Sequence, residues 1–159
     1  MNSTQVSRIL DDEHRSNLTL MGKIEQSFAR AARFDPALSG LIGQFARALE
    51  HDIARHFQFE EEELFPRMAE AGDGEMAALM IEEHEAIREV AKEVLPLAHL
   101  AAKGTIDEAG WSELRRSALE LVERQVSHIQ KETMALLPAL DDMLDDETDR
   151  ELAFAYTAD

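Results

Sequence analysis

Hydrophobic residues recur every three or four positions through most of the chain, which is the period of an amphipathic α-helix. This pattern predicts four long helices, separated by connections near residues 35, 71–74 and 104–107 that contain proline or glycine. Because short connections place successive helices antiparallel, we predict an all-α, up-down-up-down antiparallel four-helix bundle. The bundle is expected to occupy residues 1–145, followed by a short acidic C-terminal tail at residues 146–159.

Three prolines fall late in the predicted helices. Pro66, Pro96 and Pro138 each lack the N–H that would bond to the carbonyl one turn back. We therefore expect each proline to kink or end its helix. The first helix, which contains none of them, is expected to end near Phe34.

A histidine interrupts each of the four predicted apolar faces. In the first and third helices the histidine stands alone. In the second and fourth it is followed four residues later by glutamate and ten residues later by proline. Residues at i and i+4 project from the same side of a helix, so each histidine–glutamate pair faces the core. The set comprises His14, His56, Glu60, His84, His128 and Glu132.

These six residues suit a pair of metal ions. At about 1.5 Å of rise per residue, the histidines of each antiparallel helix pair fall at matching levels of the bundle. Unpaired buried glutamates are costly, whereas imidazole nitrogens and carboxylate oxygens are ligands that first-row transition metals accept. Two symmetrical glutamate–histidine salt bridges are the alternative. We predict a centre of two metal ions, with iron as the expected metal.

The remaining histidines and the acidic runs are expected on the surface. His51 lies about 140° around the helix from His56, so it should face away from the centre. His99 lies about 22 Å along its helix from His84 and cannot reach the same cluster. We interpret the acidic runs at residues 61–63 and 141–147 as solvated faces.

Composition agrees with this fold and excludes several functions. The 159 residues are 45% hydrophobic, which is enough for one domain with one core. A net charge of −17 would repel nucleic acid and anionic membranes, so neither is expected as a partner. Without cysteine, any metal must use nitrogen and oxygen ligands. The sequence contains neither a secretory signal nor a spanning apolar stretch, so a cytoplasmic location is expected.

The motifs resemble those of the hemerythrin-like HHE cation-binding domain family over roughly residues 10–140. The resemblance implies a four-helix bundle around a non-haem di-iron centre with an oxo or hydroxo bridge. It further implies that the four histidines are terminal ligands and that Glu60 and Glu132 are bridging carboxylates. The matching segments are Asp12-Glu13-His14, His56 and Glu60 followed by Leu64-Phe65-Pro66, Glu83-His84-Glu85, and His128 and Glu132 followed by Leu137-Pro138.

Two departures from the oxygen-carrying hemerythrins bear on function. Those proteins have a fifth histidine one turn before the position of His84, where this chain has Met80. They also have an aspartate five residues after the last histidine, where this chain has Thr133 preceded by Glu132. Four histidines with two glutamates resemble instead the iron-binding domain of repair-of-iron-centres proteins. The cysteine-containing domain of those proteins has no counterpart in these 159 residues.

Three functions follow as hypotheses, and the sequence assigns no catalytic residue to any of them. The first is a non-haem di-iron protein that handles either O2, NO or peroxide, or intracellular iron. A redox protein or an iron-acceptor protein, of unknown identity, would be its partner. The second is a reversible O2 carrier, store or sensor. Met80 disfavours it, because a fully coordinated second iron protects an O2 carrier against autoxidation, and methionine at this position does not supply the fifth histidine. The third is a structural or interaction bundle that holds another metal or none.

Overall fold

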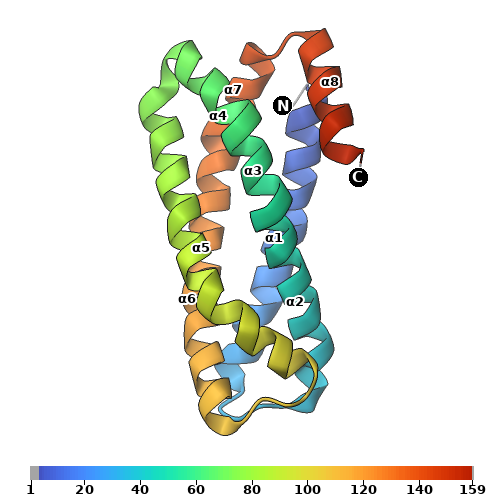
Figure 1. Cartoon of the computed structure of the whole chain (residues 1–159), viewed down its shortest axis with the longest axis vertical. Helices are drawn as coiled ribbons and strands as arrows, with labels where there is room; N and C mark the ends of the chain where they lie inside the picture. The colour runs from blue at the N-terminus through green and yellow to red at the C-terminus, as the bar shows by residue number, and fades with distance from the viewer. Residues whose placement is uncertain (1–3, 159) are drawn as a thin grey trace.

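The computed structural model describes residues 4–158, and it confirms the predicted all-α bundle. Four long helical segments run antiparallel in up-down-up-down order (Figure 1). The first segment is α1, Gln5–Arg30, and the third is α5, Gly74–Ala102. The second segment, which follows a 3₁₀ turn at Pro36–Leu38, contains α2 (Ser39–His51), α3 (Phe57–Phe59) and α4 (Phe65–Met68). The fourth contains α6 (Glu108–Lys131) and α7 (Leu137–Met143).

The second and fourth segments are continuous because π-helical turns join their α-helical parts. These turns are Asp52–His56 and Glu60–Leu64 in the second segment and Glu132–Leu136 in the fourth. Ala69–Asp73 is instead the connection from α4 to α5, where Gly72 has the positive φ of 104° that glycine tolerates. Pro66 and Pro138 each lie two residues beyond a π turn. A π turn bonds each N–H five residues back, which displaces the carbonyl that the proline ring would otherwise strike. The sequence predicted a kink or an end at each proline. Both segments continue past their proline, and the π turn before each one is the local departure from α-helical geometry.

The third proline lies inside α5, and the first helix is shorter than expected. Pro96 is within the continuous helix α5, whose last turns bend across the lower end of the bundle (Figure 1). Helix α1 ends at Arg30, before Phe34. Side chains of α6 bind its last carbonyls, since Trp111 Nε1 donates to the Ala31 carbonyl at 3.0 Å and Arg115 Nε donates to the Phe28 carbonyl at 2.7 Å. These bonds satisfy carbonyls that a helix end leaves open.

The hydrophobic core has two parts, and the predicted metal ligands lie between them. One part, with Phe28 and Trp111, fills the end of the bundle that carries the connections 31–38 and 103–107. The other part, with Leu10, Met80 and Leu140, fills the end near the two termini. Along each segment the histidine falls near the boundary between the two parts. In the second segment this boundary is just after His56, because Phe57 still belongs to the first part. The core therefore holds a polar layer between two apolar ends.

The segment expected to be an acidic tail forms a further helix, α8, Asp146–Thr157. It lies beside α1 near the N-terminus of the chain (Figure 1). Leu152, Ala153 and Tyr156 are buried and belong to the second part of the core. Their spacing places them on one face of a helix. The acidic residues around them obscured this short apolar face in the sequence.

Helix α8 also caps the N-terminus of α1. Asp149 Oδ2 accepts a hydrogen bond from the Gln5 N–H at 2.9 Å, and Oδ1 accepts one from the Val6 N–H at 3.0 Å. A carboxylate at this position satisfies open N–H groups and faces the positive end of the helix dipole. The two ends of the described chain are thereby joined.

Removing this cap is expected to destabilise the protein. We expect Asp149→Ala to lower the free energy of unfolding by about 1–2 kcal/mol, the range measured for lost helix caps. Urea unfolding followed by circular dichroism measures the loss. Glu151→Ala, at an exposed site on the same helix, is the matched control and should change stability by less than about 0.5 kcal/mol. Equal stability of the two variants would contradict the capping role.

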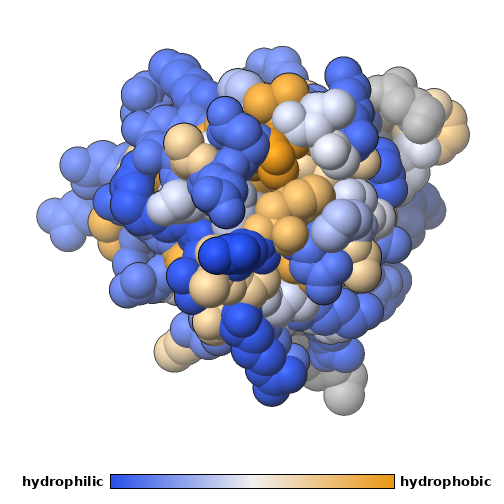
Figure 2. Space-filling view, turned by 90° about the horizontal axis from the view of Figure 1, so that it is seen from below, coloured by the Kyte–Doolittle hydropathy of each residue, from blue (hydrophilic) through white to orange (hydrophobic). Residues whose placement is uncertain are grey.

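The surface agrees with the acidic composition of the chain. Viewed along the bundle from the end with the connecting loops, hydrophilic residues surround a small hydrophobic area (Figure 2). Within residues 4–158, no helix combines the length and apolar character that crossing a membrane would require.

Candidate metal centre

The structure brings the six predicted ligands together in the middle of the bundle. His14 comes from α1, His84 from α5 and His128 from α6. The other three are at the π turns: His56 ends the first, while Glu60 and Glu132 each begin one. All six side chains are buried, with at most 2% of any of them exposed. Because π turns recur at functional sites, their position here supports a role for these residues.

The six residues form two groups that share both glutamates. One group is His14 and His56 with Glu60 and Glu132, and the other is His84 and His128 with the same two glutamates. Within each group, one nitrogen or oxygen atom per residue lies within 4.8 Å of every other. The arrangement therefore offers two neighbouring cation sites with two carboxylates in common.

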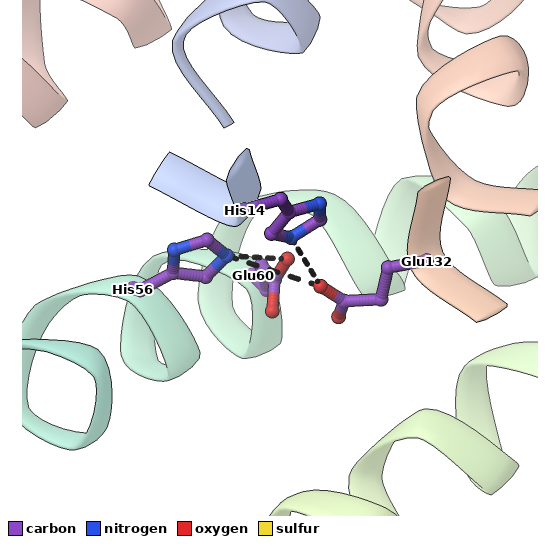
Figure 3. Close-up of side chains that lie close together, drawn as sticks. All are labelled: His14, His56, Glu60 and Glu132. Atoms are coloured by element: carbon purple, nitrogen blue, oxygen red, sulfur yellow. Dashed lines mark hydrogen bonds and ion pairs between the residues drawn. The ribbon is translucent and has the colours of Figure 1, made fainter. Parts of the chain in front are cut away.

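In the first group the imidazole Nε2 atoms face carboxylate oxygens. His14 Nε2 lies 3.0 Å from Glu132 Oε1, and His56 Nε2 lies 3.0 Å from Glu60 Oε2 (Figure 3). His56 Nε2 is also 3.8 Å from Glu132 Oε1. Both rings point into the space between the two glutamates (Figure 3).

In the second group the same glutamates present their other oxygens. His84 Nε2 lies 3.2 Å from Glu60 Oε1, and His128 Nε2 lies 3.0 Å from Glu132 Oε2. The two Nε2 atoms are themselves 3.0 Å apart. Each glutamate thus turns one oxygen toward each pair of histidines.

This geometry fits metal ions better than it fits hydrogen bonds. Among the described residues, Glu60 Oε1 and Glu132 Oε2 are buried and make no hydrogen bond, despite the nearby imidazole nitrogens. A buried oxygen without a partner is costly unless a cation binds it. Two ligand atoms that are each about 2.1 Å from a metal, at right angles, are about 3.0 Å from each other. That is the distance between His84 Nε2 and His128 Nε2.

In each of the four candidate ligand histidines, Nδ1, the ring nitrogen that points away from the centre, has a hydrogen-bond partner. Nδ1 of His56 faces Glu13 at 3.1 Å, Nδ1 of His84 faces Glu61 at 2.6 Å and Nδ1 of His128 faces Glu83 at 2.9 Å. Ionised carboxylates only accept hydrogen bonds, so these three Nδ1 atoms carry the proton. Each Nε2 lone pair is then directed into the centre, as a metal ligand requires. Nδ1 of His14 faces the hydroxyl of Thr133 at 3.1 Å.

Without metal, protons stabilise the same cluster. Burial lowers the pKa of His84, but the adjacent carboxylates of Glu132 and Glu60 outweigh it and raise the pKa to about 9. The pKa values of His56 and His128 are raised above the usual value against the same effect of burial, chiefly by Glu60 and Glu132 respectively. Burial would raise the pKa of Glu132, but His128, His14 and His56 hold it well below its usual value. Metal ions and protons therefore compete for this centre.

A buried aspartate lies next to the first group of ligands. Asp52 Oδ1 is 3.9 Å from His56 Nδ1. Its oxygens accept hydrogen bonds from Asn17 Nδ2 at 2.8 and 3.0 Å and from Gln125 Nε2 at 2.6 Å. Burial raises the pKa of this carboxyl, while His56 and Asn17 oppose the rise. Since amide donors already occupy both oxygens, we interpret Asp52 as a support of the polar layer.

The outer partners of the histidines were not predicted from the sequence. Glu61 was expected on a solvated face, but this side chain is only 24% exposed and binds both His84 and Arg88. Glu13 and Glu83 were noticed only as parts of motifs. A usable signal was present, because each directly precedes a histidine ligand on a buried face. His51 and His99 are exposed, as predicted, although His51 Nε2 lies 3.1 Å from Glu13 Oε1.

Removing the charge of an outer partner is expected to weaken metal binding. We expect Glu61→Gln to lower the affinity of the His84/His128 side about tenfold, because a neutral amide orients and polarises the imidazole less than a carboxylate does. Competition with a chromogenic zinc chelator measures the change. Glu62→Gln is the matched control, since Glu62 is exposed and accepts a hydrogen bond from Gln58 outside the centre. Equal affinities for the two variants would contradict the assigned role of Glu61.

Comparison with known protein families agrees with this centre. The family model described as the hemerythrin HHE cation binding domain matches residues 5–140, which include all six predicted ligands. A comparison with curated protein sequences found no match. The matched segment covers most of the chain, ends before α8, and carries the buried histidine and glutamate groups that suit metal ions. The chain therefore belongs to the hemerythrin HHE cation-binding domain family.

Proposed function

We propose that this chain binds two iron ions between its four histidines and two glutamates, and that it handles O2, NO or peroxide, or intracellular iron, at this centre. The observation that carries the proposal is that Glu60 and Glu132 belong to both histidine groups. Two carboxylates shared in this way suit two adjacent ions rather than one. Bound iron would supply redox chemistry and coordination positions for a small ligand.

The chain contributes a fixed set of ligands to this function. Outer carboxylates orient three of the imidazoles, so their Nε2 lone pairs need little reorganisation when an ion enters. The carboxylates of Glu60 and Glu132 offset part of the charge of two cations and leave a net positive centre, which favours binding of a small anion or diatomic ligand. Nitrogen and oxygen donors of this kind suit iron.

The surroundings of His84 favour a dry site. The Phe57 ring stacks on the His84 imidazole with centroids 3.8 Å apart, and the Phe65 ring lies 5.4 Å from it. Met80, one turn before His84, is fully buried. Apolar groups at these positions limit the access of water to this side of the centre.

Met80 also favours the proposal over reversible O2 carriage. It stands where oxygen-carrying hemerythrins have a fifth histidine, and a methionine there supplies no third imidazole to the His84/His128 side. The proposal therefore assigns that side a coordination position that no side chain of the protein fills. Reaction or iron transfer fits such a position better than protected O2 storage.

Stopped-flow absorption of the iron-loaded protein tests the proposal. The chain is loaded with Fe²⁺ under anaerobic conditions and mixed separately with O2, NO and peroxide, and iron transfer to a chelator is measured in parallel. We expect two irons per chain, and either oxidation that removal of the oxidant does not reverse or rapid release of iron. A stable oxygenated spectrum that disappears when O2 is removed would contradict the proposal in favour of a carrier. Binding of less than one iron per chain would favour a structural bundle.

A further inference from the structure

A tyrosine of α8 reaches the outer partner of one predicted ligand. Tyr156 Oη donates a hydrogen bond to Glu13 Oε1 at 2.8 Å. The same oxygen lies 3.1 Å from His56 Nδ1. Two hydrogen bonds thus connect the C-terminal helix to an imidazole whose Nε2 faces the centre. The matched family segment ends at residue 140, so this helix lies beyond it.

The segment that carries His56 holds the tyrosine firmly. Arg55 Nη2 donates to the Tyr156 carbonyl at 2.5 Å, and the Arg55 guanidinium lies 5.4 Å from the centre of the Tyr156 ring. The Phe59 ring is 4.5 Å from the tyrosine ring. The tyrosine is buried, with 8% of it exposed. These contacts fix the direction of its hydroxyl. A group that holds Glu13 in position must be fixed in this way.

The two sides of the centre differ in what holds their outer carboxylates. Glu61, behind His84, pairs with Arg88 at 2.9 Å, and Glu83, behind His128, pairs with Lys131. Both cations belong to the bundle helices α5 and α6. On the other side, Glu13 receives the neutral hydroxyl of Tyr156 and the exposed imidazole of His51. Only the His14/His56 side is connected to α8 through these contacts.

We propose that α8 stabilises one half of the centre, because Tyr156 positions His56 through Glu13. The rate of metal exchange at the His14/His56 side then depends on the packing of α8 against the bundle. The inference rests on the proposed two-metal centre. Loss of the Tyr156 hydroxyl leaves Glu13 with only the exposed imidazole of His51 to hold it against His56, so the orientation of the His56 ring is less fixed. Outer hydrogen bonds of this kind change metal affinity by about 10–100-fold. The His84/His128 side should be unaffected.

Zinc release from the full chain tests the inference, because zinc is redox-inert. The zinc-loaded protein is mixed with excess chromogenic chelator, and the release phases are compared between variants. Tyr156→Phe is expected to accelerate one phase about tenfold and to leave the other within twofold. Glu13→Gln, as a second variant, should accelerate the same phase. Phe154→Leu, at a site 75% exposed on the same helix, is the matched control and should change neither.

Nitrogen-15 NMR of the histidine rings identifies the side concerned, with and without zinc. Tyr156→Phe should shift the His56 ring resonances and leave those of His128 in place, whereas Phe154→Leu should shift neither. Equal acceleration of both phases, or no acceleration together with unchanged His56 resonances, would overturn the inference. If the chain binds no zinc or iron at all, the proposed function fails. The His56 shift in the metal-free protein then still decides whether Tyr156 positions this ring.

Discussion

Glu132→Ala is expected to reduce metal binding from two ions per chain to less than one. Glu132 Oε1 lies 3.0 Å from His14 Nε2, and Oε2 lies 3.0 Å from His128 Nε2, so the substitution removes a ligand atom from both sides at once. We expect affinity to fall by at least about 100-fold, beyond the roughly 10–100-fold that follows the loss of an outer hydrogen bond. Metal analysis by mass spectrometry after gel filtration measures the result.

Two further variants make this prediction specific. Glu123→Ala, at an exposed site on α6, is the matched control and should bind as many ions as the unmodified chain. His84→Ala should weaken chiefly the His84/His128 side, and so should retain about one ion. Two ions bound to the Glu132→Ala protein, with an unchanged absorption spectrum, would remove Glu132 from the centre.

The stability of the metal-free protein and its metal affinity are expected to respond to pH in opposite directions. The folded pKa of His84 is about 9, against 6.5 for an ordinary histidine. Its contribution to stability is therefore complete below about pH 6.5 and is lost as pH rises toward 9. One such shift corresponds to a loss on the order of 3 kcal/mol at most. At the acid end, the depressed pKa of Glu132 makes the metal-free protein less stable as pH falls below about 4.5.

Metal binding reverses the alkaline trend because each entering ion displaces protons from the imidazoles. Affinity should rise by up to about tenfold per pH unit for each proton released. Urea unfolding of the metal-free and zinc-loaded proteins between pH 6.5 and 8.5 tests both statements. His84→Gln should make the trend of the metal-free protein less steep, since the raised pKa values of His56 and His128 remain, and His99→Gln, at an exposed site, should leave the trend unchanged. Metal-free stability that rises with pH over this range would contradict the assigned electrostatics.

The six candidate ligands could be predicted from the sequence because helical geometry is regular. Histidine and glutamate four residues apart must share a face, and the rise per residue fixes their level in an antiparallel bundle. The same regularity excluded His51 and His99. The π turns at His56, Glu60 and Glu132 could not be predicted, because the hydrophobic pattern of a helix does not distinguish one π turn from an α-helical turn.

Contacts between residues far apart in the chain could not be predicted from the sequence alone. Glu13 binds a histidine 43 residues away and Glu83 binds one 45 residues away, so the identity of each partner depends on the rotation of neighbouring helices. Two acidic segments are packed against the protein more closely than their charge suggests. Acidic runs are usually solvated, yet Glu61 turns inward because His84 and Arg88 both attract it. Likewise, α8 packs on the bundle through a short apolar face within an acidic segment.

Iron stoichiometry tests the proposed two-metal centre most directly. The metal-free chain is titrated anaerobically with Fe²⁺, freed of loosely bound iron by gel filtration, and analysed for iron and protein in the same sample. The shared glutamates predict that two irons remain per chain, and that Glu132→Ala retains less than one. A chain that retains one iron or none, or a variant that retains two, would contradict the proposal of a di-iron centre.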